Sequence, residues 1–212
     1  MSLEVDVSKF DLSEIKRPQM HENEFPLFVK SIIAAQEKGG AFVEVGVNKA
    51  KSTACIYQVL SMLKANRNVY SVDATEEAHK WWKDRQRFND TCATKFILGK
   101  SQSKETVASV LHEIGWLYID ACHCYDCVCG DIEAWALKVM RYGYIVFHDT
   151  SIASNKNKAT YCINSGKKRL WGVKKAILES EIMSKKYELV ESVERKPSGG
   201  KVPGIRVYRR VS

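Results

Sequence analysis

The sequence predicts an α/β domain built on a doubly wound, mostly parallel sheet. Short apolar runs of strand-forming residues alternate with helical segments of about a dozen residues, which is typical of a parallel sheet with crossover helices. The last two strand-like runs instead flank a Pro-Ser-Gly-Gly turn, which predicts a closing antiparallel hairpin. A chain of 212 residues is long enough for one such domain with a full hydrophobic core.

The N-terminal half begins with residues 1–23, which are mixed and polar and are expected to form an arm or lid ahead of a single domain over 24–212. Apolar residues at helical spacing then predict a helix that Gly39 and Gly40 end. A continuous apolar run that ends at Gly46 predicts a buried strand. The same alternation continues, so helices are expected over 24–38, 52–65 and 78–89, and strands over 41–46, 69–73 and 95–98.

The C-terminal half continues the alternation and then changes its pattern. Two apolar runs that end in polar residues predict two neighbouring parallel strands, and alternating residues near the end of the chain predict the antiparallel pair. Helices are expected over 103–114, 132–141 and 173–182, and strands over 116–120, 144–148, 187–193 and 204–209.

The composition is that of a soluble globular protein, with 45% hydrophobic and 27% charged residues. No apolar run approaches the ~20 residues that span a bilayer, and the N-terminus lacks a secretory pattern, so a cytoplasmic location without membrane association is expected. The net charge of +8 fits either a solvated basic face or attraction of an acidic ligand, but no motif points to nucleic acid. Homo-oligomerisation is left open.

Ionisable side chains follow the two neighbouring strands at the points where they end. Asp120 and His123 come after the strand over 116–120, and His148 and Asp149 close the strand over 144–148. Ligands bind at the carboxyl ends of strands in open α/β sheets. These four side chains are therefore expected to share one rim and to form the reactive part of an enzyme site.

The loop after the first strand and the end of the second strand predict a nucleotide-like ligand. Gly46 allows a tight turn that leaves backbone amides facing a ligand. Asp73 closes the second strand, where a carboxylate either accepts hydrogen bonds from ribose hydroxyls or caps the next helix. The loop lacks the Gly-x-Gly-x-x-Gly pattern of dinucleotide-binding folds, which disfavours a nicotinamide cofactor.

Five motifs in order resemble those of class I S-adenosylmethionine-dependent methyltransferases, closest to the small-molecule and sugar O-methyltransferases, many of them magnesium-dependent. The motifs are Val43-Glu-Val-Gly46, Val72-Asp73, Gly99-Lys-Ser101, Ile119-Asp-Ala-Cys-His-Cys-Tyr125 and Phe147-His-Asp-Thr150. The resemblance covers roughly residues 25–210. It implies a Rossmann-like seven-stranded sheet with an antiparallel C-terminal strand, and O-methylation of a small-molecule or sugar hydroxyl.

The resemblance also implies roles for the residues at the first three strand ends. Glu44 and Gly46 would lie near the methionine part of S-adenosylmethionine, Asp73 would hold the ribose, and Gly99 with Ser101 would border the adenine. The chain departs from its relatives in two ways. Its first loop is poor in glycine, and Lys100 stands where an acidic residue is common.

At the reactive end, Asp120 and Asp149 are expected to bind a metal or to polarise the acceptor, which makes Asp120 a candidate catalytic residue. The resemblance implies a divalent metal, Mg²⁺ or Mn²⁺, held by Asp120, Asp149 and the residue before it, which here is His148. An imidazole ligand suits manganese, iron or zinc better than magnesium. Some relatives carry an acidic base at the position of Cys122, which this chain lacks. The role of general base is therefore expected to pass to His123, because an unperturbed histidine titrates near physiological pH.

Two other functions remain open on the sequence alone, namely an NAD(P)-dependent oxidoreductase and a non-catalytic nucleotide- or nucleic-acid-binding module. The cluster Cys122-x-Cys124-x-x-Cys127-x-Cys129 is dense enough for a metal. Its spacing is not standard, however, and residues one apart at a strand end point in opposite directions. Small buried cysteines are the expectation there.

Overall fold

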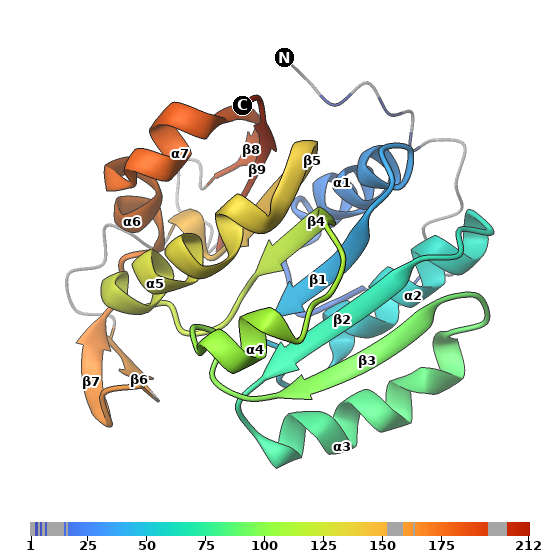
Figure 1. The fold of residues 1–212 in the computed structure, drawn as a ribbon, viewed down its shortest axis with the longest axis horizontal. Coiled ribbons are helices and arrows are strands. Elements are labelled where there is room, and N and C mark those ends of the chain that lie inside the picture. Colours follow the sequence, from blue (N-terminus) through green and yellow to red (C-terminus); the bar gives the residue numbers. More distant parts are fainter. Residues whose placement is uncertain are drawn as a thin grey trace.

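The computed structural model describes residues 3, 5, 7, 15, 17–151, 159–162, 164–194 and 203–212. Its main sheet is seven-stranded. The strands are β1 (Ala41–Val45), β2 (Asn68–Asp73), β3 (Ala93–Leu98), β4 (Ile114–Ile119), β5 (Val139–His148), β8 (Tyr187–Val193) and β9 (Ile205–Arg210). Their spatial order is β3-β2-β1-β4-β5-β9-β8 (Figure 1). The C-terminal strand β9 runs antiparallel to both of its neighbours, β5 and β8, and the other pairs are parallel, which confirms the predicted sheet.

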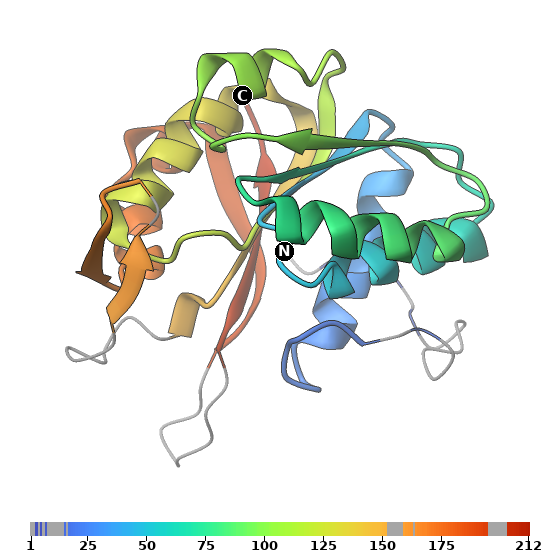
Figure 2. The same ribbon diagram turned by 90° about the horizontal axis from the view of Figure 1, so that it is seen from below.

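Helices cover both faces of the sheet (Figure 2). The first face carries α1 (Phe25–Gln36), α2 (Lys51–Met62) and α3 (Glu76–Arg85), and the second carries α4 (Lys104–Ala108), α5 (Tyr125–Trp135), α6 (Val173–Glu179) and α7 (Glu181–Lys186). Alternate residues of each strand enter opposite cores. Within β4, Trp116 and Tyr118 pack in the first core, whereas Leu117 packs in the second.

The strand order reverses at β1, which pairs with β2 on one side and β4 on the other. The helices that follow β1 and β4 lie on opposite faces, so their loops diverge and leave a crevice at the carboxyl ends of the strands. This topological switch point positions the candidate site.

Three predicted helices differ from the observed ones. The helix expected over 103–114 ends at Ala108, because Ile114 already pairs in β4. The helix expected over 132–141 begins earlier, at Tyr125, and a 3-10 turn at Ala136–Lys138 leads directly into β5. The helix expected over 173–182 is split at Ser180, whose extended backbone and hydroxyl cap α7.

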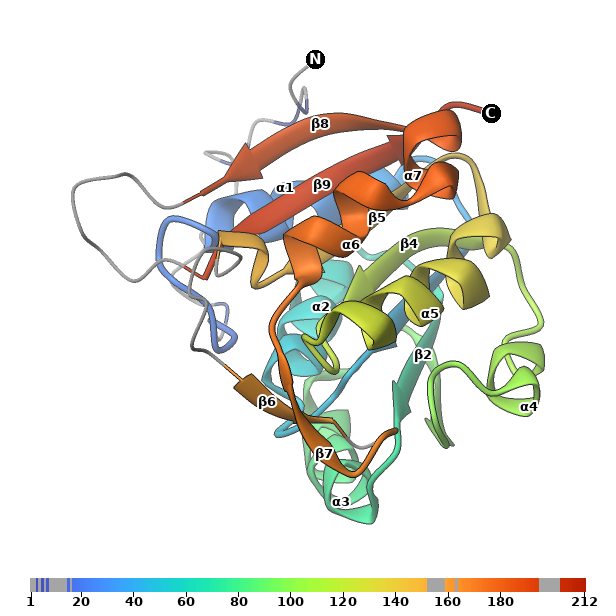
Figure 3. The same ribbon diagram turned by 90° about the vertical axis from the view of Figure 1, so that its left-hand side faces the viewer.

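A second, two-stranded sheet was not predicted (Figure 3). Its strands β6 (Ala159–Cys162) and β7 (Lys167–Leu170) form an antiparallel hairpin between β5 and α6. The run Lys167-Lys-Arg-Leu170 is exposed throughout, so it carries no hydrophobic pattern that would mark a strand. Among the described residues, no helix is long and apolar enough to cross a membrane.

Candidate active site

A cavity of about 680 Å³ lies at the carboxyl ends of the parallel strands. Its wall is formed by the loops that follow β1, β2, β3, β4 and β5. Pro18, Gln19 and Met20 close one side, and Tyr161 and Asn164 approach from the β6–β7 hairpin and its turn. This volume suits a small-molecule ligand or cofactor. The rest of the predicted arm over 1–23 lies largely outside the described residues.

The loop after β1 adopts left-handed conformations with few glycines. Gly46 has a φ of 96°, and Asn48 and Ala50 have φ values of 47° and 51°. A Cβ atom at Gly46 would lie 2.3 Å from the carbonyl oxygen of Asp120, so only glycine allows the β1 and β4 ends to approach this closely. Asn48 and Ala50 thus take conformations that glycine would adopt without strain.

Asp73 fastens that loop to the end of β2. Its Oδ2 atom accepts hydrogen bonds from the amides of Val47 at 2.9 Å and Asn48 at 3.1 Å. Its Oδ1 atom accepts from the amide of Thr75 at 3.0 Å and from the Thr75 hydroxyl at 2.8 Å. Asp73 also lines the cavity. Protein donors therefore occupy the four acceptor positions of this carboxylate, and a ribose hydroxyl would have to replace one of them.

Glu44 lies beneath the cavity and not in the wall formed by the described residues. The side chain is fully buried and accepts hydrogen bonds from the hydroxyls of Ser52 and Thr53 at the start of α2. Burial raises the pKa of Glu44 to about 7, although the two hydroxyls counteract this. The observed contacts give Glu44 a part in holding α2 against β1.

The segment after β3 contributes Gly99 and Ser101 to the cavity, and α5 contributes Asp131, an acidic residue that was not predicted. The Ser101 hydroxyl donates to Oδ1 of Asp131 at 2.5 Å. Asp131 is 1% exposed, and burial raises its pKa to about 6 against the effect of the Ser101 and Gln102 hydrogen bonds. The sequence contained a signal that could have identified Asp131. It lies at helical spacing from Val128 and Trp135, and a carboxylate on the buried face of a helix is rare.

The four ionisable side chains expected to share one rim do lie together. The Nε2 atom of His123 lies 3.1 Å from Oδ1 of Asp120 and 3.0 Å from Oδ2 of Asp149. The Nδ1 atom of His148 lies 3.4 Å from the same Asp120 oxygen and 3.9 Å from the same Asp149 oxygen. The Tyr118 hydroxyl donates to the other Asp120 oxygen at 3.0 Å. Two imidazoles and two carboxylates therefore form one network.

Charge pairing controls the protonation of this network. Burial alone would lower the pKa of His123, but hydrogen bonds to Asp120 and Asp149 outweigh it and raise that pKa to about 9. In the same way, Asp120 and Glu24 raise the pKa of His148 well above its ordinary value despite its burial. Burial would raise the pKa of Asp120, but the two histidines lower it well below its usual range.

Two overlapping sets of these side chains could hold a divalent metal. Ligand atoms of Asp120, His123 and Asp149 all lie within 4.8 Å of one another, and His148 faces the same two carboxylates. The Nδ1 atom of His148 is buried and makes no hydrogen bond with any described residue, although it faces Asp120 and Asp149. Its Nε2 atom is held 3.2 Å from the buried carboxylate of Glu24. A metal-binding histidine commonly has its second nitrogen held by a carboxylate in this way. Asp149 itself adopts a left-handed φ of 59°, a strained conformation that is frequent at functional sites.

The imidazole of His123 stacks on Trp171 at the cavity wall. The ring centroids are 4.4 Å apart, with an angle of 29° between the planes. Trp171 lies directly after β7, and the next residue, Gly172, donates its amide to the carbonyl oxygen of His123 at 2.8 Å. Trp171 and Gly172, which follow the hairpin, therefore hold the loop of His123 in place through one ring contact and one backbone hydrogen bond.

The sequence was compared with known protein families, curated proteins and solved structures. The family described as "Methyltransferase domain" matches residues 43–150, which contain the ends of β1, β2, β3, β4 and β5. No match is found among curated protein sequences.

Several solved structures are similar in fold. The cofactor-bound protein Rv0187 from MTB is 11% identical, with a TM-score of 0.64 over 94% of this chain and 85% of that one. The TDP-rhamnose 3'-O-methyltransferase CalS11 is 12% identical, with a TM-score of 0.58 over 90% and 81%. An O-methyltransferase from Bacillus cereus, in complex with SAH, is 14% identical, with a TM-score of 0.57 over 87% and 80%. At these identities the likeness concerns the fold.

Proposed function

Because the chain belongs to the methyltransferase-domain family, we propose that it transfers a methyl group from S-adenosylmethionine to an oxygen of a small molecule or sugar. The family confirms the methyltransferase predicted from the sequence, in place of an oxidoreductase or a non-catalytic binding module. The observation that carries the O-methylation proposal is the network of Asp120, His123, His148 and Asp149 at one end of the cavity. Two similar structures, CalS11 and the Bacillus cereus protein, are O-methyltransferases.

The ends of β1, β2 and β3 are proposed to hold the cofactor. Gly46 brings the backbone close to the methionine part, and Asp73 accepts from the ribose while keeping its bonds to the Val47 and Asn48 amides. The ribose hydroxyl then replaces the Thr75 hydroxyl. Gly99 and Ser101 border the adenine, and Asp131 adds the acidic acceptor that is missing at Lys100.

His123 is proposed to take the proton from the acceptor hydroxyl. Its Nε2 atom faces two carboxylate oxygens within 3.1 Å and therefore carries the proton in the neutral ring. Nδ1 is then the atom that accepts a proton. Because the pKa of His123 is raised to about 9, the ring becomes neutral only in alkaline solution, so turnover should increase as the pH approaches 9. As the new carbon–oxygen bond forms, the carbon–sulfur bond of the cofactor breaks, and the resulting imidazolium is stabilised by Asp120 and Asp149.

Asp120, His148 and Asp149 are proposed to hold a divalent metal. The mixture of carboxylate and imidazole ligands favours Mn²⁺ over Mg²⁺. When bound, such an ion lowers the pKa of a hydroxyl and fixes its oxygen in position. Glu24 orients His148 for this role through its hydrogen bond to Nε2.

Calorimetric titration of the full chain with S-adenosylhomocysteine tests the cofactor assignment, with NADH as the comparison ligand. Micromolar binding of the thioether and none of NADH is expected. Asp73→Ala should weaken binding by about 10–100-fold, the loss expected when charge-assisted hydrogen bonds are removed. Asp90→Ala is the control, because Asp90 lies outside the cavity wall of the described residues. Binding of NADH alone would contradict the proposal.

The base assignment is tested with labelled S-adenosylmethionine and a panel of hydroxylated acceptors. Once an acceptor is found, His123→Asn should lower kcat by about 10²–10⁴-fold, the usual contribution of a general base. Affinity for S-adenosylhomocysteine should change little. Full turnover of this variant between about pH 6 and 9 would remove His123 from the mechanism.

A further inference from the structure

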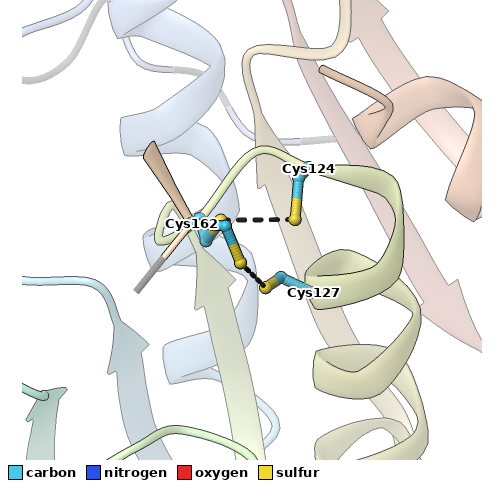
Figure 4. Close-up of side chains that lie close together, drawn as sticks. Cys124, Cys127 and Cys162 are labelled. Carbon is cyan, nitrogen blue, oxygen red and sulfur yellow. Dashed lines mark hydrogen bonds between the residues drawn. The ribbon is translucent and has the colours of Figure 1, made fainter. Parts of the chain in front are cut away.

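Four cysteine thiols converge beside the cavity, contrary to the expectation from the sequence. The Sγ atoms of Cys122, Cys124, Cys127 and Cys162 all lie within 4.8 Å of one another. Cys122 and Cys124 are 3.5 Å apart, and Cys127 and Cys162 are 3.3 Å apart. Figure 4 shows Cys162 of the hairpin facing Cys124 and Cys127 at the start of α5.

The cysteine side chains do not point in opposite directions, as was expected for a strand end, because these cysteines do not lie on a strand. β4 ends at Ile119, and Cys124 is the N-cap of α5 with extended backbone angles. The loop therefore turns between Cys122 and Cys124, and the first turn of α5 brings Cys127 back to the same side. The fourth thiol comes from β6 instead of from Cys129, whose side chain interacts with Tyr125.

Ordinary packing does not explain this arrangement. Cys124, Cys127 and Cys162 are 1%, 4% and 2% exposed, and they form a buried cluster of their own. Among the described residues, its only other hydrophobic neighbour is Cys122. All four thiols are free. A polar group is also directed at the cluster, because the side-chain amide of Asn164 donates to Sγ of Cys127 at 3.4 Å.

We propose that Cys122, Cys124, Cys127 and Cys162 bind a structural zinc ion. In a tetrahedral site with Zn–S bonds of about 2.3 Å, neighbouring sulfur atoms are about 3.8 Å apart, so the observed separations need only small side-chain rotations. The spacing is too short for thiolates that surround an iron–sulfur cluster. Four thiolates fill the coordination shell, and the ion is therefore closed to substrate. The amides at the start of α5 and the Asn164 amide offset the negative charge.

The zinc ion would fasten the β6–β7 hairpin to the loop between β4 and α5. After the hairpin, the backbone is already tied to this loop by the bridge between Cys124 and Trp171. Cys162 supplies a second attachment on β6. Because Tyr161 and Asn164 line the cavity, the ion would fix one wall of the site without taking part in methyl transfer. This inference does not rest on the identity of the acceptor.

Zinc content is the direct test. The full chain, purified without added metal, is expected to contain about one zinc ion by mass spectrometry. Cobalt exchanged into the site should show thiolate-to-cobalt absorption and the visible bands of a tetrahedral ion. Cys162→Ser should reduce the zinc content to about a tenth or less, since loss of even an outer partner costs 10–100-fold in affinity. The control is Cys129→Ser, which should keep its full zinc content because Cys129 lies on α5, as Cys127 does, but outside the cluster.

A second measurement on the unaltered chain covers the case in which Cys162→Ser does not fold. Removing zinc with a chelator should speed tryptic cleavage after Lys167, Lys168 and Arg169, which are exposed on β7. Adding zinc back should restore protection. Metal-free protein without the cobalt bands, stoichiometric iron in place of zinc, disulfides among the four cysteines, or equal zinc loss in Cys129→Ser would each overturn the proposal.

Discussion

The Nε2 atom of His148 lies 3.2 Å from Oε2 of Glu24, and this contact joins the end of β5 to the residue before α1. Both side chains are buried, at 4% and 0% exposure. The other oxygen of Glu24 accepts from the amide of Gly204, just before β9. One carboxylate thus connects three segments beneath the site. Burial would raise the pKa of Glu24, but its hydrogen bond to His148 lowers it overall.

Glu24→Ala should therefore lower the free energy of unfolding by about 3–5 kcal/mol, because it leaves the buried His148 without its partner. Urea unfolding followed by circular dichroism measures this change. Glu22→Ala is the control, since Glu22 is exposed and its loss should cost less than about 0.5 kcal/mol. Equal stabilities of the two variants would show that the His148–Glu24 contact contributes nothing.

The ligand-free protein should lose stability at alkaline pH. His123 has a pKa of about 9 in the folded chain, against 6.5 for the free side chain, so its contribution is complete below about pH 6.5 and disappears as the pH rises through 9. The loss is on the order of 3 kcal/mol. Urea unfolding at several pH values in the presence of a chelator should show the decline. His123→Gln should remove the share of His123 and leave that of His148, whose pKa is also raised. If the stability of His123→Gln fell with pH as steeply as that of the unaltered protein, the loss of stability would come from groups other than His123.

Much of the architecture follows from local patterns in the sequence, whereas the parts that were missed depend on tertiary contacts. Apolar runs that end in Gly46, Asp73 and Asp120 are sufficient to place three strand ends at one edge. The start of α5 was missed because its first turns are rich in cysteine, aspartate and glycine, which are poor helix formers, although Cys127 and Val128 continue the buried face of the helix. The exposed β7 strand shows no strand pattern either.

The same distinction applies to the residues of the candidate site: those that follow predicted strands were expected, and those brought in by tertiary contacts were not. Asp120, His123, His148 and Asp149 were expected to meet because they follow adjacent strands of the predicted sheet. Glu24 and Asp131 were not expected there, since one precedes a helix and the other lies within one. Cys162 reaches Cys127 across 35 residues of sequence, a distance over which periodicity carries no information.

Asp149→Asn should abolish metal-stimulated methyl transfer and leave binding of S-adenosylhomocysteine unchanged. Asparagine suits this test because it tolerates the left-handed φ of 59° at this position, so the loss of charge is separated from backbone strain. Activity is measured against added Mn²⁺ and Mg²⁺. Asp126→Asn, an exposed acidic residue at the start of α5, serves as the control. If Asp149→Asn kept its response to both metals, Asp149 would not be a metal ligand.

Comparison of Gly46→Ala with Gly39→Ala separates the cost of backbone strain from the cost of a steric clash between the new Cβ atom and a neighbouring strand end. Both glycines have left-handed φ values, 96° and 89°, so alanine should cost about 1–2 kcal/mol at either position through backbone strain alone. At Gly39 the new Cβ atom meets nothing within 4 Å, whereas at Gly46 it lies 2.3 Å from the carbonyl oxygen of Asp120. Gly46→Ala should therefore cost about 1–3 kcal/mol more, as overpacking does.

The shift at Gly46 also moves the Asp120 loop, so Gly46→Ala should weaken S-adenosylhomocysteine binding while Gly39→Ala does not. Urea unfolding and calorimetry on the same two proteins measure both effects. Equal stability losses would mean that the ends of β1 and β4 separate at little cost. In that case the close approach at Gly46 could not be what holds the cofactor loop against the reactive residues.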